Sequence, residues 1–176
     1  MQVHRTVLTL GAAVVLAGFA FGSNGAPQSR PLEDRVRHEL LMLPYYNVFE
    51  DLSYRVENGV VTLTGKVTRP INSRNAEAAV KRLPGVERVE NQIEVLPLSN
   101  YDDRLRLRTL NAIYGFAPLQ RYGWGTQPSI RILVKNGNVT LAGAVRSDAD
   151  RNMAFLRANA IPGAFSVTNE LRVERD

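Results

Sequence analysis

The chain contains no cysteine and only two histidines among its 176 residues. Without cysteine it cannot form disulfide bonds, thiolate metal sites, a cysteine nucleophile or the lipid-modified cysteine of a bacterial lipoprotein. His4 lies in the N-terminal segment, and His38 follows Asp34 by four residues in a helical pattern, a spacing typical of an exposed ion pair. We therefore expect no metal site and no catalytic histidine.

Other catalytic signatures are missing as well. No glycine-rich phosphate-binding loop precedes a predicted helix. The adjacent carboxylates Glu50 and Asp51, and likewise Asp102 and Asp103, stand where helix caps and turns commonly use acidic residues. The sequence therefore predicts a protein that is not an enzyme and needs no cofactor.

The N-terminal segment, residues 1–26, has the layout of a secretory signal peptide. A single charge, Arg5, precedes the apolar run 7–21, and small residues follow that run. The run is short for a membrane span, which favours cleavage, with Ser23 as the expected first residue of the mature chain. An uncleaved anchor is the alternative, because no further charge appears before Arg30.

Positive charge is unevenly distributed along the rest of the chain. Residues 31–98 contain 9 basic and 10 acidic side chains, whereas residues 101–176 contain 11 basic and 7 acidic side chains. A weakly basic surface suits an anionic membrane or a nucleic acid, but an exported protein rarely meets nucleic acid. We therefore expect no nucleic-acid partner.

An internal repeat organises the chain. Residues 58–67 match residues 136–145 at an offset of 78, and the same offset aligns 83–85 with 161–163. Upstream, residues 34–37 match 103–106 at an offset of only 69, so the second copy is longer between its first helix and its first strand. The predicted modules are residues 31–98 and 101–174, with an insertion at about 115–128.

The hydrophobic periodicities predict the element order αββαβ in both copies. In the first copy, a helix that stops at Pro44 precedes a hairpin whose strands alternate around Asn58-Gly59. A second helix, with Ser73 as a possible cap, ends at Pro84-Gly85, and residues 89–95 form a third strand. The predicted fold class is α+β: two tandem modules, each a small three-stranded sheet packed with two helices.

Eight residues at equivalent places in the two copies are predicted to be structural turn residues. Asn-Gly supplies the positive φ angles of a type I′ turn, and the other glycines fit a close approach at a strand end or the end of a helix. These residues are Asn58, Gly59, Gly65, Gly85, Asn136, Gly137, Gly143 and Gly163.

This combination of motifs resembles the BON domain, which is named for bacterial osmotically induced and nodulation proteins. The likeness rests on the αββαβ order, the repeated pattern N-G-x-V-T-L-x-G-x-V, and a Pro-Gly pair before the last strand. The second copy departs from the pattern at Ala164, where the first copy has Val86, and in its longer connection. The resemblance implies a non-catalytic module of the periplasm or the membrane surface, often proposed to bind phospholipid.

Two features of the second copy are unusual for a purely structural module. In its first helix, Leu107, Leu110 and Tyr114 form a second apolar stripe beside Arg104, Arg106 and Arg108. This pattern is typical of an interfacial helix at an anionic membrane, but it also fits a helix that packs on the first module.

The second feature is the aromatic insertion, which contains the only tryptophan, Trp124, and also Phe116, Leu119 and Tyr122 around Arg121. Amphipathic rings favour membrane interfaces and protein contacts alike. A connection folded back over its own sheet is the alternative.

The sequence thus predicts a non-enzymatic envelope protein, periplasmic or membrane-associated, whose second module binds an anionic phospholipid surface. The alternative is a protein-interaction or chaperone-like adaptor that uses the same surface, or an exposed sheet edge, to bind another envelope protein. The residues expected to bind lipid are Arg104, Leu107, Arg108, Phe116, Arg121, Tyr122 and Trp124.

Overall fold

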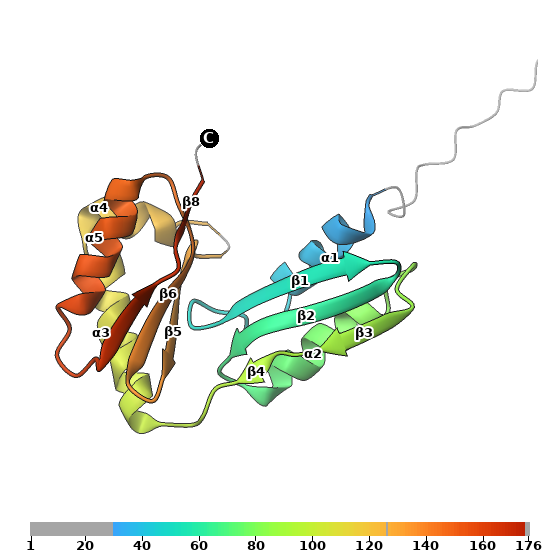
Figure 1. Cartoon of the computed structure of the whole chain (residues 1–176), viewed down its shortest axis with the longest axis horizontal. Helices are drawn as coiled ribbons and strands as arrows, with labels where there is room; N and C mark the ends of the chain where they lie inside the picture. The colour runs from blue at the N-terminus through green and yellow to red at the C-terminus, as the bar shows by residue number, and fades with distance from the viewer. Residues whose placement is uncertain (1–29, 126, 175–176) are drawn as a thin grey trace, which may run out of the picture.

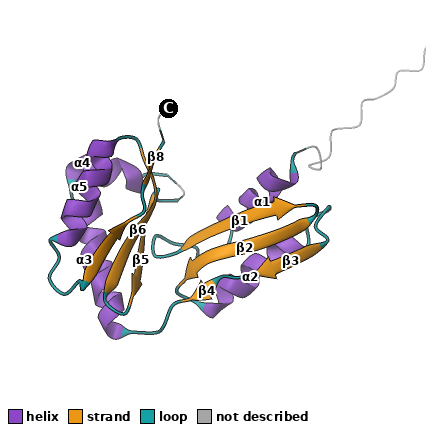
Figure 2. Ribbon diagram, in the orientation of Figure 1, coloured by secondary structure: helices purple, strands orange, loops and turns teal. Residues whose placement is uncertain are grey.

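The computed structural model describes residues 30–125 and 127–174, so the predicted signal at 1–26 lies outside the described residues. The chain folds as two α+β modules that lie side by side, joined by a linker from β4 to α3 (Figure 1). In each module the helices cover one face of a sheet (Figure 2). None of the helices in the described ranges has the length and apolar character needed to cross a bilayer.

The first module contains two helices and a sheet. Helix α1 ends at Leu41, ahead of Pro44, and its buried residues Val36 and Leu40 follow the predicted helical spacing. The elements are α1 (Leu32–Leu41), β1 (Asp51–Glu57), β2 (Val60–Val67), α2 (Pro70–Lys81), β3 (Arg88–Asn91) and β4 (Glu94–Val95).

The second module repeats this order and adds a short helix and a 3₁₀ turn in its longer connection. Its elements are α3 (Asn100–Tyr114), α4 (Ala117–Gln120), the 3₁₀ turn η2 (Arg121–Gly123), β5 (Ile130–Lys135), β6 (Asn138–Val145), α5 (Asp148–Asn159), β7 (Ser166–Asn169) and β8 (Arg172–Val173).

Both sheets have the same mixed topology. Strand β1 pairs antiparallel with β2, and β3 and β4 pair parallel with β2 after the α2 crossover. The predicted third strand is split because the side chain of Asn91 accepts a hydrogen bond from the Ile93 amide. Asn169 accepts one from the Leu171 amide in the second module. Strand β1 is therefore at one edge of the first sheet, and β5 is at the equivalent edge of the second sheet.

The hairpin turns have the backbone of a type I′ turn. Asn58 and Gly59 have φ angles of 48° and 77°, and Asn136 and Gly137 have φ angles of 51° and 77°. In the second module the buried carboxylate of Asp102 accepts hydrogen bonds from both turn amides, at 2.9 and 2.8 Å. This contact fixes α3 to the hairpin.

The second helix begins earlier than Ser73, so the predicted cap is wrong. Helix α2 starts at Pro70, whose fixed φ suits the first helical turn and whose missing amide donor costs nothing there. Ser73 lies inside the helix, and its hydroxyl instead contacts Asn91. In the second module Ser147 is the N-cap of α5 and accepts a hydrogen bond from the Asp150 amide.

The loop that follows α1 attaches the first module to the second. Val48 and Phe49 pack against the core of the second module, and the Val48 carbonyl accepts a hydrogen bond from the Ile132 amide on β5, at 2.9 Å. The guanidinium of Arg131 lies 4.7 Å from the centre of the Tyr46 ring. The loop reaches β5 in Figure 1.

The linker side of the junction is also packed. Leu96 and Leu133 are both buried and line one small cavity between the modules. Lys135 of β5 forms an ion pair with Glu94 of β4 at 2.5 Å. Strand β5 is therefore buried on both faces, whereas β1 alternates between half-buried and exposed residues.

Candidate functional site

The outer face of α3 carries three of the residues expected to bind lipid. Arg104 and Arg108 are exposed, and Leu107 between them is 54% exposed. Arg108 donates a hydrogen bond to the Pro162 carbonyl at 3.2 Å, which holds its side chain along the helix surface. An exposed leucine between two arginines gives this face an apolar centre and a basic rim.

The apolar stripe predicted on α3 is divided by the fold. Leu110 and Tyr114 pack against the core of the second module, beside Val48 from the first module. The Tyr114 hydroxyl donates a hydrogen bond to the Ile130 carbonyl at 2.6 Å, and burial raises the pKa of Tyr114 to about 12. Only Leu107 remains on the outside, so packing on the first module and exposure to solvent each account for part of the stripe.

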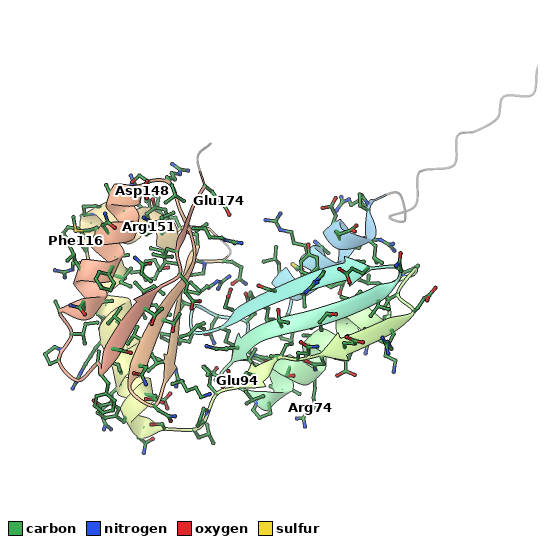
Figure 3. All side chains as sticks on the ribbon, in the orientation of Figure 1. Arg74, Glu94, Phe116, Asp148, Arg151 and Glu174 are labelled. Carbon is green, nitrogen blue, oxygen red and sulfur yellow. The ribbon has the colours of Figure 1, made fainter. Side chains whose placement is uncertain are left out.

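Phe116 lies away from this face. Its ring packs against the core, and the guanidinium of Arg157 lies 5.0 Å from the ring centre. Figure 3 places Phe116 among the helices, on the opposite side of the second module from Glu174.

The insertion is only partly a surface feature. Tyr122 is 6% exposed, and its hydroxyl donates to Asp150 at 2.8 Å and accepts from the Arg146 amide at 2.9 Å. Arg121 forms an ion pair with the same carboxylate at 2.7 Å. Tyr122 therefore belongs to the core, where it holds the connection onto the start of α5.

The Asp150 carboxylate is the centre of this network. Burial raises its pKa, but hydrogen bonds from Ser147, Tyr122 and Arg121 lower it, and the net pKa lies below the ordinary value of 3.8. A carboxylate with a depressed pKa stabilises the fold above its unfolded pKa, and this contribution is lost as the pH falls through the folded value. The network is thus intact at neutral pH.

Trp124 is the exposed part of the insertion. The indole is 76% exposed and lines a cavity of about 630 Å³ that is also lined by Arg121, Ser129, Arg146 and Glu174. The cavity lies beside the connection between α3 and β5. The equivalent connection of the first module, between α1 and β1, is the loop that packs on β5. Sequence reasoning did not identify Arg146 or Glu174, which lie at strand ends far from the insertion along the chain.

Two further exposed aromatic side chains lie near the start of α3. Tyr101 and Phe165 stack with their ring centres 5.8 Å apart, and Phe165 is 74% exposed. The Tyr101 hydroxyl donates to the Gly163 carbonyl. A comparison of the two copies could have found this pair, because Phe165 stands where the first copy has Glu87.

The structure therefore does not gather the seven expected residues into one site. Arg104, Leu107 and Arg108 share the outer face of α3, and Arg121 and Trp124 share the cavity at the other end of that helix. Within the described ranges, no group of three or more histidine, aspartate or glutamate side chains is arranged to hold a metal ion.

A family model for the BON domain matches residues 29–97 and 119–175. The chain belongs to the BON domain family, as its motifs predicted. The second match begins after α3, so the basic and apolar face of that helix lies outside the part that matches the family model.

Two solved structures are similar to the chain at low identity. One is CdsD, a structural protein of the type III secretion system of Chlamydia trachomatis, with 15% identity over 82% of this chain and 93% of that chain, and a TM-score of 0.30. The other is the C-terminal domain of CdsD, with 12% identity over 81% of this chain and 97% of that chain, and a TM-score of 0.29. At these TM-scores the likeness supports no inference about this chain. No curated protein sequence matches the chain.

Proposed function

We propose that this protein is a non-enzymatic component of the bacterial cell envelope that binds the surface of anionic phospholipid membranes through the outer face of α3. The observation that carries the proposal is the exposed Leu107 between Arg104 and Arg108. Membership of the BON family and the signal-like segment 1–26 support an envelope location.

The chemistry of this face suits the boundary between headgroups and acyl chains. Arginines attract anionic headgroups, and an apolar side chain between them can enter the acyl boundary. The stacked pair Tyr101 and Phe165 lies beside the first turn of α3 and adds aromatic area at the same end. The acidic residues of that turn do not oppose this charge strongly, because Asp102 is buried in the hairpin contact and Asp103 is paired with Arg106.

Flotation with lipid vesicles tests the proposal. The protein should float with phosphatidylglycerol vesicles and remain at the bottom of the gradient with phosphatidylcholine vesicles. Replacing Arg104 and Arg108 by serine should weaken binding to the anionic vesicles by about 10- to 30-fold, since each charge near such a surface contributes up to about 1 kcal/mol. Binding should also weaken as salt is raised.

A matched control uses the first module. Arg74 and Arg82 lie on or just after α2 and are also exposed, so replacing both by serine changes the net charge equally. This control should float like the unmodified protein. If the two double variants float equally well, the α3 surface is not the lipid site.

Trp124 reports on the other end of α3 without a mutation. Because it is the only tryptophan, its emission can be assigned directly. We expect a blue shift on addition of phosphatidylglycerol vesicles, since an exposed indole would move from water into the interface. An unchanged spectrum together with flotation would restrict the contact to the Arg104–Arg108 end of the helix.

The second candidate is a protein-interaction adaptor. The cavity beside Trp124 favours it, since exposed tryptophan and arginine side chains are typical anchors of protein interfaces. An adaptor of this kind should float with neither type of vesicle, and the same flotation measurement detects this outcome.

A further inference from the structure

The two edge strands of this protein differ in how they are covered. Along β5, three outward-facing backbone groups are bound by other parts of the chain. The Ile130 carbonyl accepts from the Tyr114 hydroxyl, the Ile132 amide donates to the Val48 carbonyl, and the Val134 carbonyl accepts from Arg106. A turn of the first module, at Val48 and Phe49, thus already covers part of this edge.

The corresponding edge of β1 is open over most of its length. In an antiparallel pair, alternate residues direct their backbone groups away from the partner strand. The Leu52 amide points outward, because it donates to the Tyr46 hydroxyl at 3.3 Å, so the backbone groups of Tyr54 and Val56 point outward too. Within the described ranges no hydrogen bond is formed by the outward amides of Tyr54 and Val56.

A groove runs beside this open edge. It has a volume of about 510 Å³ and lies between α1, β1 and the end of β8. Tyr46 and Tyr54 supply aromatic walls, Arg37 contributes a cation from α1, and Arg172 contributes another from the second module. Glu174 also lines the groove, 3.8 Å from the Arg172 guanidinium and with both side chains exposed, so the two arginines leave the groove with a net positive charge.

We propose that the edge of β1 binds an extended, acidic segment of a partner polypeptide as an added strand. Tyr54 and Val56 offer donors and acceptors at strand spacing, which main-chain recognition at a sheet edge requires. The two arginines on the groove walls select a carboxylate-bearing segment by charge complementarity. This inference is independent of the lipid-binding proposal, because it uses a different surface and a different kind of ligand.

The chain itself supplies a suitable probe. A peptide with the sequence of residues 45–51, capped at both ends, contains the loop whose Val48 carbonyl binds β5, and it ends in the acidic pair Glu50-Asp51. The intact β5 edge should not take up the free peptide, because the tethered loop occupies that edge at a high effective concentration. Binding of the fluorescently labelled peptide to the purified protein can be followed by anisotropy.

Two changes to the peptide test strand addition without altering the protein. In an added strand, alternate residues of the peptide direct their backbone groups toward the edge, and the residues between them direct theirs away. Methylation of one of the two neighbouring amides, Val48 or Phe49, should therefore weaken binding at least about tenfold, whereas methylation of the other should have little effect. Equal effects of the two methyl groups would overturn strand addition.

Two protein variants test the location. Replacing Arg37 and Arg172 by serine should weaken peptide binding about three- to tenfold, and replacing Arg74 and Arg82 by serine should not. The Arg104 and Arg108 variant should bind the peptide normally even though its binding to anionic vesicles is weakened. Absence of peptide binding at millimolar concentration, or a stable dimer in sedimentation that the Arg37 and Arg172 variant abolishes, would overturn the proposal in favour of an empty edge or a second copy.

Discussion

Replacing Gly143 by alanine is expected to lower the free energy of unfolding by about 3 to 5 kcal/mol, measured by chemical denaturation. A Cβ atom at this position would lie 2.0 Å from the Ser129 carbonyl oxygen, which is backbone and cannot turn aside. The φ angle of 100° adds strain for any residue with a side chain. Strain and overpacking each contribute about 1 to 3 kcal/mol, and here they coincide.

The first module contains the equivalent position and a matched control. A Cβ atom at Gly65 would lie 2.1 Å from the Asp51 carbonyl oxygen, so Gly65→Ala should destabilise the protein to a similar extent. Gly85 also has a positive φ angle, 90°, but its nearest neighbour would be 3.8 Å away, so Gly85→Ala should show only the strain, about 1 kcal/mol. If Gly65→Ala and Gly85→Ala have equal effects, close approach of the opposite strand is not the reason for glycine at position 65.

The element order was predictable because the same motifs occur in the same order in both copies of the repeat. Asn58-Gly59 and Asn136-Gly137 occupy the same place in each copy, and a local turn preference fixes each hairpin without help from distant residues. The start of α2 differs from the predicted cap at Ser73 because Pro70, three residues earlier, has a stronger preference for the first turn of a helix.

The packing of one module on the other was harder to predict. The run Ile130 to Val134 is apolar at nearly every position, whereas the equivalent run in β1 alternates, and this difference reflects the second buried face of β5. The sequence contains that signal, but it does not say which surface covers the strand. That depends on a loop more than 80 residues earlier, in which Val48 meets Ile132.

The candidate site was predicted only in part, for a similar reason. Helical spacing was sufficient to place Arg104, Leu107 and Arg108 on one exposed face. Composition alone could not separate Trp124, which is exposed, from Tyr122, which is buried. The hydroxyl of Tyr122 has two partners in the core, the Asp150 carboxylate and the Arg146 amide, and these come together only in the folded module.

The first module contains an equivalent buried contact in which the donor and the acceptor are exchanged. There the buried carboxylate of Glu50 accepts hydrogen bonds from the Thr68 amide at 3.1 Å and from the Asn72 side chain at 2.7 to 2.8 Å. Asn72 corresponds to Asp150 at the 78-residue offset. In the first module the acceptor, Glu50, lies in the connection before β1, and the donor, Asn72, lies on α2. In the second module Tyr122 of the connection donates to the acceptor Asp150 on α5.

Replacing Glu50 by alanine should therefore lower the free energy of unfolding by about 3 to 5 kcal/mol. The substitution removes the acceptor of the Thr68 amide and hydroxyl and leaves the buried Asn72 side chain with only the Tyr45 carbonyl, and each unsatisfied donor costs about 1 to 3 kcal/mol. Glu50→Gln keeps the shape and one oxygen, so it should cost clearly less than Glu50→Ala in the same denaturation experiment.

The exchange of donor and acceptor between the two modules suggests a double variant that tests the pair. Asn72→Asp alone would place two carboxylates together in the core, which should destabilise the protein by about 3 kcal/mol or more at neutral pH and by less in acid, where one of them takes up a proton. Combining Asn72→Asp with Glu50→Gln restores a donor opposite the new carboxylate, while the glutamine oxygen still accepts from Thr68. The double variant should recover at least about half of the loss, and recovery remains partial because the Tyr45 carbonyl loses its hydrogen bond from Asn72. Additive losses in this mutant cycle would show that Glu50 and Asn72 do not act as a pair.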